Sequence, residues 1–116
     1  MNLFKQIFGG GSGLTATDAQ ARLTAAQPPL LIDVRQPDEY RGGHIRGAKL
    51  IPLGELSQKF DKLPRDREII CVCRSGARSG NAVRQLQSAG LNAVNLNGGM
   101  IAWQRAGLPV EKGNGR

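Results

Sequence analysis

Short apolar runs alternate along this chain with segments whose apolar residues recur at helical spacing. Runs typical of strands lie at residues 30–34, 48–51, 68–73 and 93–96. Helices are expected at residues 17–26, 38–41, 53–63, 80–89 and 100–106. A continuous apolar run favours a strand that is covered on both faces, as in a parallel sheet. The alternation therefore predicts an α/β domain with a mostly parallel sheet.

Capping residues place the expected ends of several helices. Thr17 and Gln20 have the spacing of a capping box, which predicts that the first helix begins there. Pro37 suits the first turn of a short helix, because a proline there lacks only an N–H that would have no partner. Gly90 has the position of a C-terminal cap for the helix at residues 80–89.

The length of 116 residues suits one domain with a real core. We expect an N-terminal tail with a Gly-rich linker at residues 1–13, a folded domain at 14–110, and a polar C-terminal tail at 111–116. The apolar residues within 1–8 can form one face of a docking helix, or they can pack on the domain itself. The second interpretation is favoured, because eight residues are too few for a stable isolated helix.

Charge and composition exclude several classes of function. Lysine and arginine outnumber aspartate and glutamate by 16 to 9, so the formal net charge is +7 and favours anionic partners. The basic residues are spread out and few aromatics accompany them, so nucleic acid is not expected as the primary partner. No apolar stretch approaches the roughly 20 residues of a transmembrane segment, and no signal-peptide pattern is seen. Two cysteines only two positions apart make a disulfide implausible, so a cytoplasmic protein is expected.

Cys73 ends the strongest predicted strand, and a loop of glycine, serine and arginine follows it at residues 74–79. In parallel sheets, ligand sites form beyond the carboxyl ends of strands. Inward N–H groups, the positive end of the next helix, and the side chains of Arg74 and Arg78 would all favour the Cys73 thiolate. Cys71 lies inside the apolar run and is predicted to pack as a small core residue.

A thiolate in a cationic loop suits two reactions. It can attack the outer sulfur of an anionic donor such as thiosulfate, and inward N–H groups would stabilise the resulting persulfide. It can also attack the phosphorus of a phosphate monoester, which needs a larger loop and an acid for the leaving group. The spacing from Cys73 to Arg78 is Cys-X4-Arg, one residue shorter than the Cys-X5-Arg loop of cysteine phosphatases. The shorter loop favours sulfur chemistry.

The chain lacks the residues that a metal site, a Cys-His hydrolase or a nucleotide-binding loop would need. A metal site needs three or four ligands, whereas the chain offers two cysteines and one histidine. A Cys-His hydrolase would need His44 to reach Cys73, and a structural hydrogen-bonding role for His44 is favoured. The loop also lacks the GxxxxGK[ST] pattern of a nucleotide-binding loop. We therefore expect no metal and no cofactor.

Three further motifs accompany the loop at residues 73–79. They are, in chain order, Leu31-Ile32-Asp33-Val34-Arg35 with Glu39-Tyr40, Gly43-His44-Ile45-Arg46-Gly47-Ala48 with Ile51-Pro52, and Gly98-Gly99 with Trp103 and Gly107-Leu108-Pro109-Val110. With these segments in this order, residues 14–110 resemble the rhodanese family, specifically its single-domain thiosulfate sulfurtransferases. The loop resembles the six-residue form of these enzymes, while the related phosphatases carry a longer one.

The resemblance implies a single rhodanese-like domain, with a parallel five-stranded sheet and helices on both faces. It also implies that Cys73 is the catalytic residue and forms the persulfide. The residues that it implies for substrate binding are Arg74, Ser75, Gly76, Ala77, Arg78 and Ser79. Their N–H groups would surround the outer sulfur, and the two arginines would help to bind the anionic donor.

The activity implied by the resemblance is transfer of sulfane sulfur from thiosulfate or a similar small anion. The sulfur would pass through the Cys73 persulfide to cyanide, to a thiol or to a protein acceptor, without a cofactor. Two alternatives stay open. One is a phosphatase or arsenate reductase on the same fold, and the other is a non-enzymatic sulfur carrier or interaction module.

Several charged residues of the motifs invite a catalytic interpretation. Asp33, Arg35, Glu39 and His44 are instead expected to hold loops around the sheet by hydrogen bonds and ion pairs, because structural ion-pair networks are common. Trp103 is expected to lie in the core or at the rim of the pocket.

Overall fold

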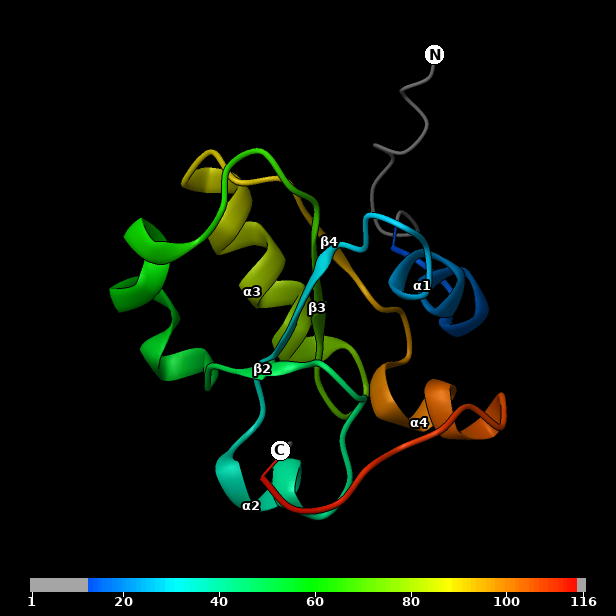
Figure 1. The fold of residues 1–116 in the computed structure, drawn as a ribbon. Helices are drawn as coiled ribbons and strands as arrows, with labels where there is room; N and C mark the ends of the chain where they lie inside the picture. The colour runs from blue at the N-terminus through cyan, green and yellow to red at the C-terminus, as the bar shows by residue number, and fades with distance from the viewer. Residues whose placement is uncertain (1–12, 115–116) are drawn as a thin grey trace.

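A sheet of four strands forms the centre of the fold, in the order β2-β1-β3-β4. Figure 1 shows the helices arranged around it. The computed structural model describes residues 13–114, so the docking helix considered for residues 1–8 lies outside the described residues. The elements in chain order are α1 (Ala16–Leu23), β1 (Leu30–Asp33), α2 (Pro37–Arg41), β2 (Lys49–Leu50), η3 (Leu53–Lys62), β3 (Ile69–Val72), α3 (Ala77–Ser88), β4 (Ala93–Asn95) and α4 (Gly99–Arg105). The predicted order of strands and helices is confirmed, with η3 a 3₁₀ helix.

The strand pairs are all parallel, as the apolar runs predict. Leu30 in β1 is aligned with Ile69 in β3, and Ile69 is in turn aligned with Ala93 in β4. On the other side of β1, Ile32 is aligned with Lys49 in β2. Because parallel strands point the same way, the loops that follow β1, β3 and β4 gather at one edge of the sheet.

The expectation of a fifth strand is wrong for the described residues, because their sheet has four strands. Leu14 lies beside β4 and forms only a single parallel bridge, with Leu96. Gly13 precedes this bridge, and Thr15 already caps α1 directly after it. Glycine weakens a strand and the helix begins at once, so little extended backbone is left there for pairing.

The starts of α1 and α3 differ from the sequence prediction in ways that bear on the site. The N-cap of α1 is Thr15, whose hydroxyl accepts a hydrogen bond from the Asp18 N–H at 3.1 Å. The capping box predicted at Thr17 is therefore wrong, because the chain turns into the helix as soon as it leaves the sheet. Helix α3 begins at Ala77 instead of residue 80, after Gly76 in a left-handed conformation. This start places Ser79 in the first turn of α3, close to Cys73.

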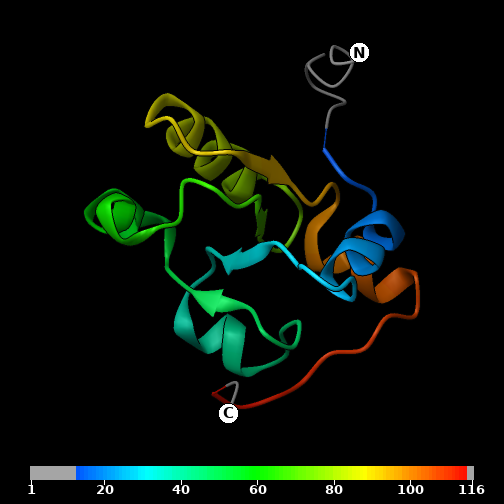
Figure 2. The ribbon, with the colours of Figure 1, turned by 45° about the horizontal axis from the view of Figure 1, so that its top comes forward.

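Apolar clusters cover both faces of the sheet, and Figure 2 shows the helices on each side. One face packs against η3 and α3, and its fully buried members include Ile32, Leu56, Ile69, Cys71 and Leu86. The other face packs against α1 and α4, and its members include Ala19, Leu31, Ile70, Val72 and Trp103. The structure confirms that Cys71 is a core residue. The core position of Trp103 is also confirmed, and its indole N–H donates to the Pro109 carbonyl at 2.8 Å.

The C-terminal segment returns across the molecule to the region of α2 (Figure 1). Glu111 and His44 exchange two backbone hydrogen bonds of 2.8 and 2.9 Å in an antiparallel bridge. The Gly113 N–H then donates to the Arg41 carbonyl at 2.9 Å. These contacts fasten the loop that follows α2. No helix within residues 13–114 is long and apolar enough to cross a membrane.

Candidate active site

Cys73 directly follows β3, an inner strand between β1 and β4. The chain then makes a short loop and enters α3 at Ala77. The Cys73 residue is only 1% exposed, although Arg74 and Ser75 after it are exposed. The sulfur therefore lies at the bottom of a tight loop, at the carboxyl edge of the sheet where the sequence predicts a ligand site.

Three hydrogen-bond donors point at the Cys73 sulfur. The Gly76 N–H lies 3.1 Å from Sγ, and the N–H and hydroxyl of Ser79 each lie 3.3 Å from it. Gly76 has a φ of +107°, a conformation that residues with a side chain rarely adopt. That conformation turns the backbone so that the loop encloses a single sulfur atom. Gly76 and Ser79, both predicted to bind substrate, thus contact the sulfur itself.

The loop favours the charged form of Cys73. Burial raises the pKa of the Cys73 thiol, but hydrogen bonds from the Ser79 hydroxyl and from the N–H groups of Ser79, Gly76 and Ser75 outweigh burial, and the net pKa is lowered. The predicted preference for the thiolate agrees with this direction, although hydrogen bonds are its source. Burial raises the pKa of Cys71 to about 12, with a further contribution from Cys73, so Cys71 stays a neutral thiol.

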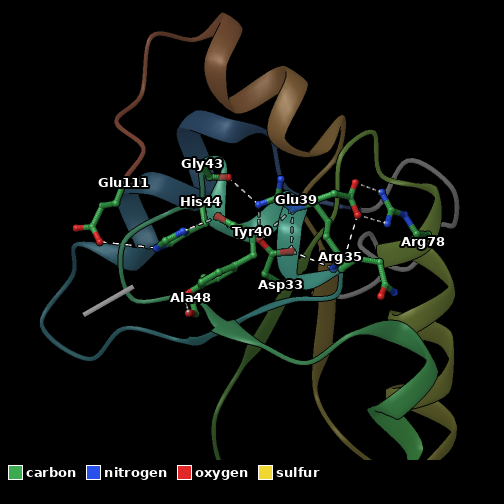
Figure 3. Close-up of polar contacts among 10 residues, drawn as sticks. Asp33, Arg35, Glu39, Tyr40, Gly43, His44, Ala48, Arg78 and Glu111 are labelled. Atoms are coloured by element: carbon green, nitrogen blue, oxygen red, sulfur yellow. Dashed lines mark hydrogen bonds and ion pairs between the residues drawn. The ribbon is translucent and has the colours of Figure 1, made fainter. Parts of the chain in front are cut away.

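Arg78 is held by a carboxylate from a different element. Its guanidinium donates to the two Glu39 carboxylate oxygens at 2.8 and 2.9 Å, so α2 and α3 are joined beside the loop (Figure 3). The hydrogen bond from Arg78 lowers the pKa of Glu39 to about 2. An ion-pairing role was expected for Glu39, but the sequence did not predict that its partner is Arg78, 39 positions away. Arg74 is exposed and forms no ion pair within residues 13–114.

Asp33 and Arg35 form a buried ion pair at the end of β1. The Arg35 guanidinium donates to both Asp33 oxygens and also to the Gly43 carbonyl, at distances between 2.8 and 3.2 Å (Figure 3). The pair ties the end of β1 to the loop that follows α2. This geometry fits the structural role that we expected for both residues.

His44 belongs to a separate cluster between α2 and the C-terminal segment (Figure 3). Its ring stacks on Tyr40, with 3.8 Å between the ring centroids, and its Nδ1 lies 2.8 Å from the Tyr40 carbonyl oxygen. Its Nε2 lies 3.8 Å from a Glu111 carboxylate oxygen. The Tyr40 hydroxyl donates to the Ala48 carbonyl at 2.8 Å. His44 therefore has the hydrogen-bonding role expected of it.

The first turn of α4 holds the carbonyl side of the loop. The N–H groups of Met100 and Ile101 donate to the carbonyls of Cys73 and Arg74, at 2.8 and 3.1 Å. Gly99 has a φ of +58°, and a Cβ at this position would overlap the Cys73 carbonyl oxygen. Gly99, the first residue of α4, is thus needed for the close approach of this helix to the backbone of the loop.

Asn95 is a site residue that the sequence analysis missed. It is the last residue of β4, and its Oδ1 lies 2.6 Å from the Ser79 hydroxyl oxygen. Its Nδ2 donates to the Gly76 carbonyl at 3.1 Å. The sequence feature that could have identified Asn95 is its place at the carboxyl end of a predicted strand, at the edge of the sheet that also carries Cys73. In residues 13–114, no three histidine, cysteine, aspartate or glutamate side chains gather in a group that could hold a metal ion.

The pattern of this site and fold has known relatives. The sequence model of the family described as Rhodanese-like domain matches residues 15–106. The chain belongs to the rhodanese-like domain family. This rhodanese-like domain is 41% identical over 90 residues to a sulfurtransferase of Allochromatium vinosum, a match that covers 77% of the chain and 84% of that protein. It is 39% identical over 83 residues to a putative sulfurtransferase, YtwF, of Bacillus subtilis, a match that covers 72% of the chain and 81% of that protein.

The fold agrees with solved structures of the same family. The rhodanese-like domain superposes on a rhodanese-related protein from Thermoplasma volcanium with a TM-score of 0.79 and 35% identity. That superposition covers 85% of this chain and 96% of the other. Other relatives are longer, and the matches cover 38% and 47% of two of them. The family thus includes proteins in which the rhodanese-like domain is one part of a larger chain.

Proposed function

We propose that this rhodanese-like domain is a sulfurtransferase that carries sulfane sulfur on Cys73. The observation that carries the proposal is the ring of three donors around the Cys73 sulfur, with the pKa of that thiol lowered. A thiolate that is already formed needs no general base to attack a sulfur donor. The names of the relatives and the short Cys-X4-Arg loop support the same reaction.

The reaction has two steps that balance without an external oxidant or reductant. The Cys73 thiolate attacks the outer sulfur of thiosulfate, a new S–S bond forms, and sulfite leaves with the electrons of the broken bond. The persulfide then gives its outer sulfur to cyanide, to a thiol or to a protein acceptor, and the Cys73 thiolate returns. N–H groups of the loop stabilise the negative charge, first on Sγ and then on the outer sulfur. The residues proposed to line this path are Arg74, Ser75, Gly76, Ala77, Arg78 and Ser79.

The two arginines contribute unequally to donor binding in this proposal. Glu39 neutralises much of the charge of Arg78 and occupies two of its N–H donors. Arg74 directly follows Cys73, is exposed and forms no ion pair within residues 13–114, so its charge is available to an anion. Arg74→Gln is therefore expected to raise the KM for thiosulfate more than Arg78→Gln does.

The reaction suits a reducing, cytoplasmic setting. Both cysteines of the chain are free, and thiol acceptors persist where disulfides are kept reduced. The proposed partners are therefore a small anionic sulfur donor and a thiol or protein acceptor.

Thiocyanate formation from thiosulfate and cyanide tests the proposal. Wild type and Cys71→Ala are expected to form thiocyanate, and Cys73→Ser is expected to form none. Intact mass after thiosulfate treatment is expected to show one added sulfur, which cyanide removes. Equal activity of Cys73→Ser and wild type would refute the proposal.

The remaining alternatives give different results in the same assays. A phosphatase would hydrolyse an aryl phosphate and form no thiocyanate. A sulfur carrier would accept sulfur in the mass measurement yet pass it only to a protein partner. Deletion of residues 1–13 separates docking from chemistry. If residues 1–8 dock a partner, transfer to cyanide would survive the deletion while delivery to that partner would fail.

A further inference from the structure

The amide of Asn95 has a defined orientation beside the loop. Nδ2 donates to the Gly76 carbonyl at 3.1 Å, and a carbonyl can only accept, so Nδ2 and Oδ1 cannot exchange places without the loss of this bond. Oδ1 therefore faces the Ser79 hydroxyl at 2.6 Å as an acceptor. Ser79 is fully buried, so its hydroxyl depends on protein groups for its hydrogen bonds.

The Ser79 hydroxyl has two acceptors but only one proton. Cys73 Sγ lies 3.3 Å from Ser79 Oγ, on the same oxygen that Asn95 Oδ1 approaches to 2.6 Å. A hydroxyl donates a single hydrogen bond, so the two acceptors compete. A thiolate is the stronger acceptor because hydrogen bonds to charged groups are about twice as strong as neutral ones. When Cys73 Sγ is neutral, it accepts only weakly, and the Asn95 oxygen is the better partner.

We propose that Asn95 is a positioning residue that accepts the Ser79 hydroxyl proton whenever the negative charge leaves Cys73 Sγ. In the free thiolate, the hydroxyl donates to Sγ. In the persulfide, the charge sits on the outer sulfur, Sγ is bonded on both sides, and the hydroxyl turns back to Asn95. Asn95 thereby stabilises the persulfide relative to the thiolate and makes sulfur loading more favourable. The persulfide part of this inference rests on the proposed function, whereas the competition for the hydroxyl does not.

A double-mutant cycle tests the competition without any sulfur transfer. The rate at which iodoacetamide alkylates Cys73 is measured against pH in wild type, Asn95→Leu, Ser79→Ala and the double variant. Asn95→Leu replaces the competing acceptor by an apolar side chain of similar size. The pH midpoint of Cys73 alkylation is therefore expected to fall by about 0.5–1 pH unit. In the Ser79→Ala background, the same substitution removes only the Nδ2 bond to the Gly76 carbonyl, so the midpoint is expected not to fall there. The difference between the two backgrounds measures the competition for the hydroxyl. Arg78 and Cys71, the two neighbours whose own pKa values the charge of Cys73 raises, are the same in all four proteins.

A purely structural role predicts a different result. If Asn95 only holds the Gly76 carbonyl, its loss loosens the loop, and the midpoint rises equally in both backgrounds. That result, or no shift at all, would overturn the inference. Asn95→Ala supplies the same cycle if leucine is not accommodated, and thermal unfolding identifies variants that do not fold.

The persulfide is tested separately by intact mass at a fixed ratio of thiosulfate to sulfite. Asn95→Leu is expected to lower the ratio of persulfide to thiolate roughly threefold to tenfold, and to have no effect when Ser79 is alanine. If Asn95→Leu leaves the ratio of persulfide to thiolate unchanged in the protein that keeps Ser79, the inference about the persulfide is overturned. If the wild type forms no persulfide at all, the proposed function fails, while the alkylation cycle still decides whether Asn95 acts through Ser79.

Discussion

Glu39 and Arg78 form an ion pair through two hydrogen bonds of 2.8 and 2.9 Å, although 39 positions separate them in the sequence. Glu39 also accepts a hydrogen bond from the N–H of Gln36, the N-cap residue of α2. The pair therefore holds the start of α2 against the first turn of α3. Because Ser79 follows Arg78 directly, the pair also helps to keep the donors of the loop in place around Cys73.

Glu39→Gln is expected to lower stability by up to about 1 kcal/mol at neutral pH, the range of partly exposed ion pairs. The pKa of Glu39 is lowered from 4.5 to about 2, so the pair contributes fully above pH 4.5 and its contribution is lost as the pH falls toward 2. Denaturant unfolding at pH 7 and pH 3 is expected to show that the difference from wild type shrinks at the lower pH. A difference that grows on acidification would contradict this linkage. Glu68→Gln is the control, since Arg22 and Glu68 are joined by only one hydrogen bond.

The two cysteines are expected to differ in reactivity. Cys73 should be alkylated with a midpoint below 9.0, the ordinary thiol value from which its pKa is lowered. Cys71 lies inside β3 and its thiol stays neutral, with a pKa of about 12, so it should react only after unfolding. Peptide mapping after iodoacetamide treatment, in buffer and in denaturant, distinguishes the two. Label on Cys71 in the native protein would show that this prediction is wrong.

Gly99→Ala is expected to destabilise the fold and to disturb the loop. An alanine there pays about 1–2 kcal/mol for the left-handed conformation, and its Cβ overlaps the Cys73 carbonyl, which adds roughly 1–3 kcal/mol. Gly107→Ala is the matched control, with a φ of +75° and no atom within 4 Å of the added Cβ. Thermal unfolding of both variants measures the difference. Equal losses would mean that the contact with Cys73 has no cost.

Arg35→Met is expected to cost about 3–5 kcal/mol, because it leaves the buried Asp33 carboxylate without its partner. Arg46→Met also breaks an arginine–carboxylate pair, with Glu111, but the Arg46 side chain is 88% exposed. Its loss is expected to stay below about 1 kcal/mol. Urea unfolding of the two variants checks the contrast, and similar losses would refute the assigned importance of burial.

Much of the fold could be predicted because its strands carry a local signal. All four residues of β3 are buried, and the run of apolar residues there is visible in the sequence. The ends of elements were less predictable. Helix α1 begins after Thr15 because Leu14 is still paired with Leu96, a contact across the molecule that no local pattern contains.

The site divides in the same way. The sequence by itself determined the parallel α/β class, the position of Cys73 after a buried strand, and the contrast between Cys73 and the core residue Cys71. Adjacent residues and their spacing carry this information. Only the tertiary structure decided that Glu39 pairs with Arg78 and that Asn95 and Cys73 both approach the Ser79 hydroxyl. It also decided that the sheet of the described residues has four strands. These outcomes depend on contacts between residues far apart in the chain, whose geometry exists only once the strands have packed side by side.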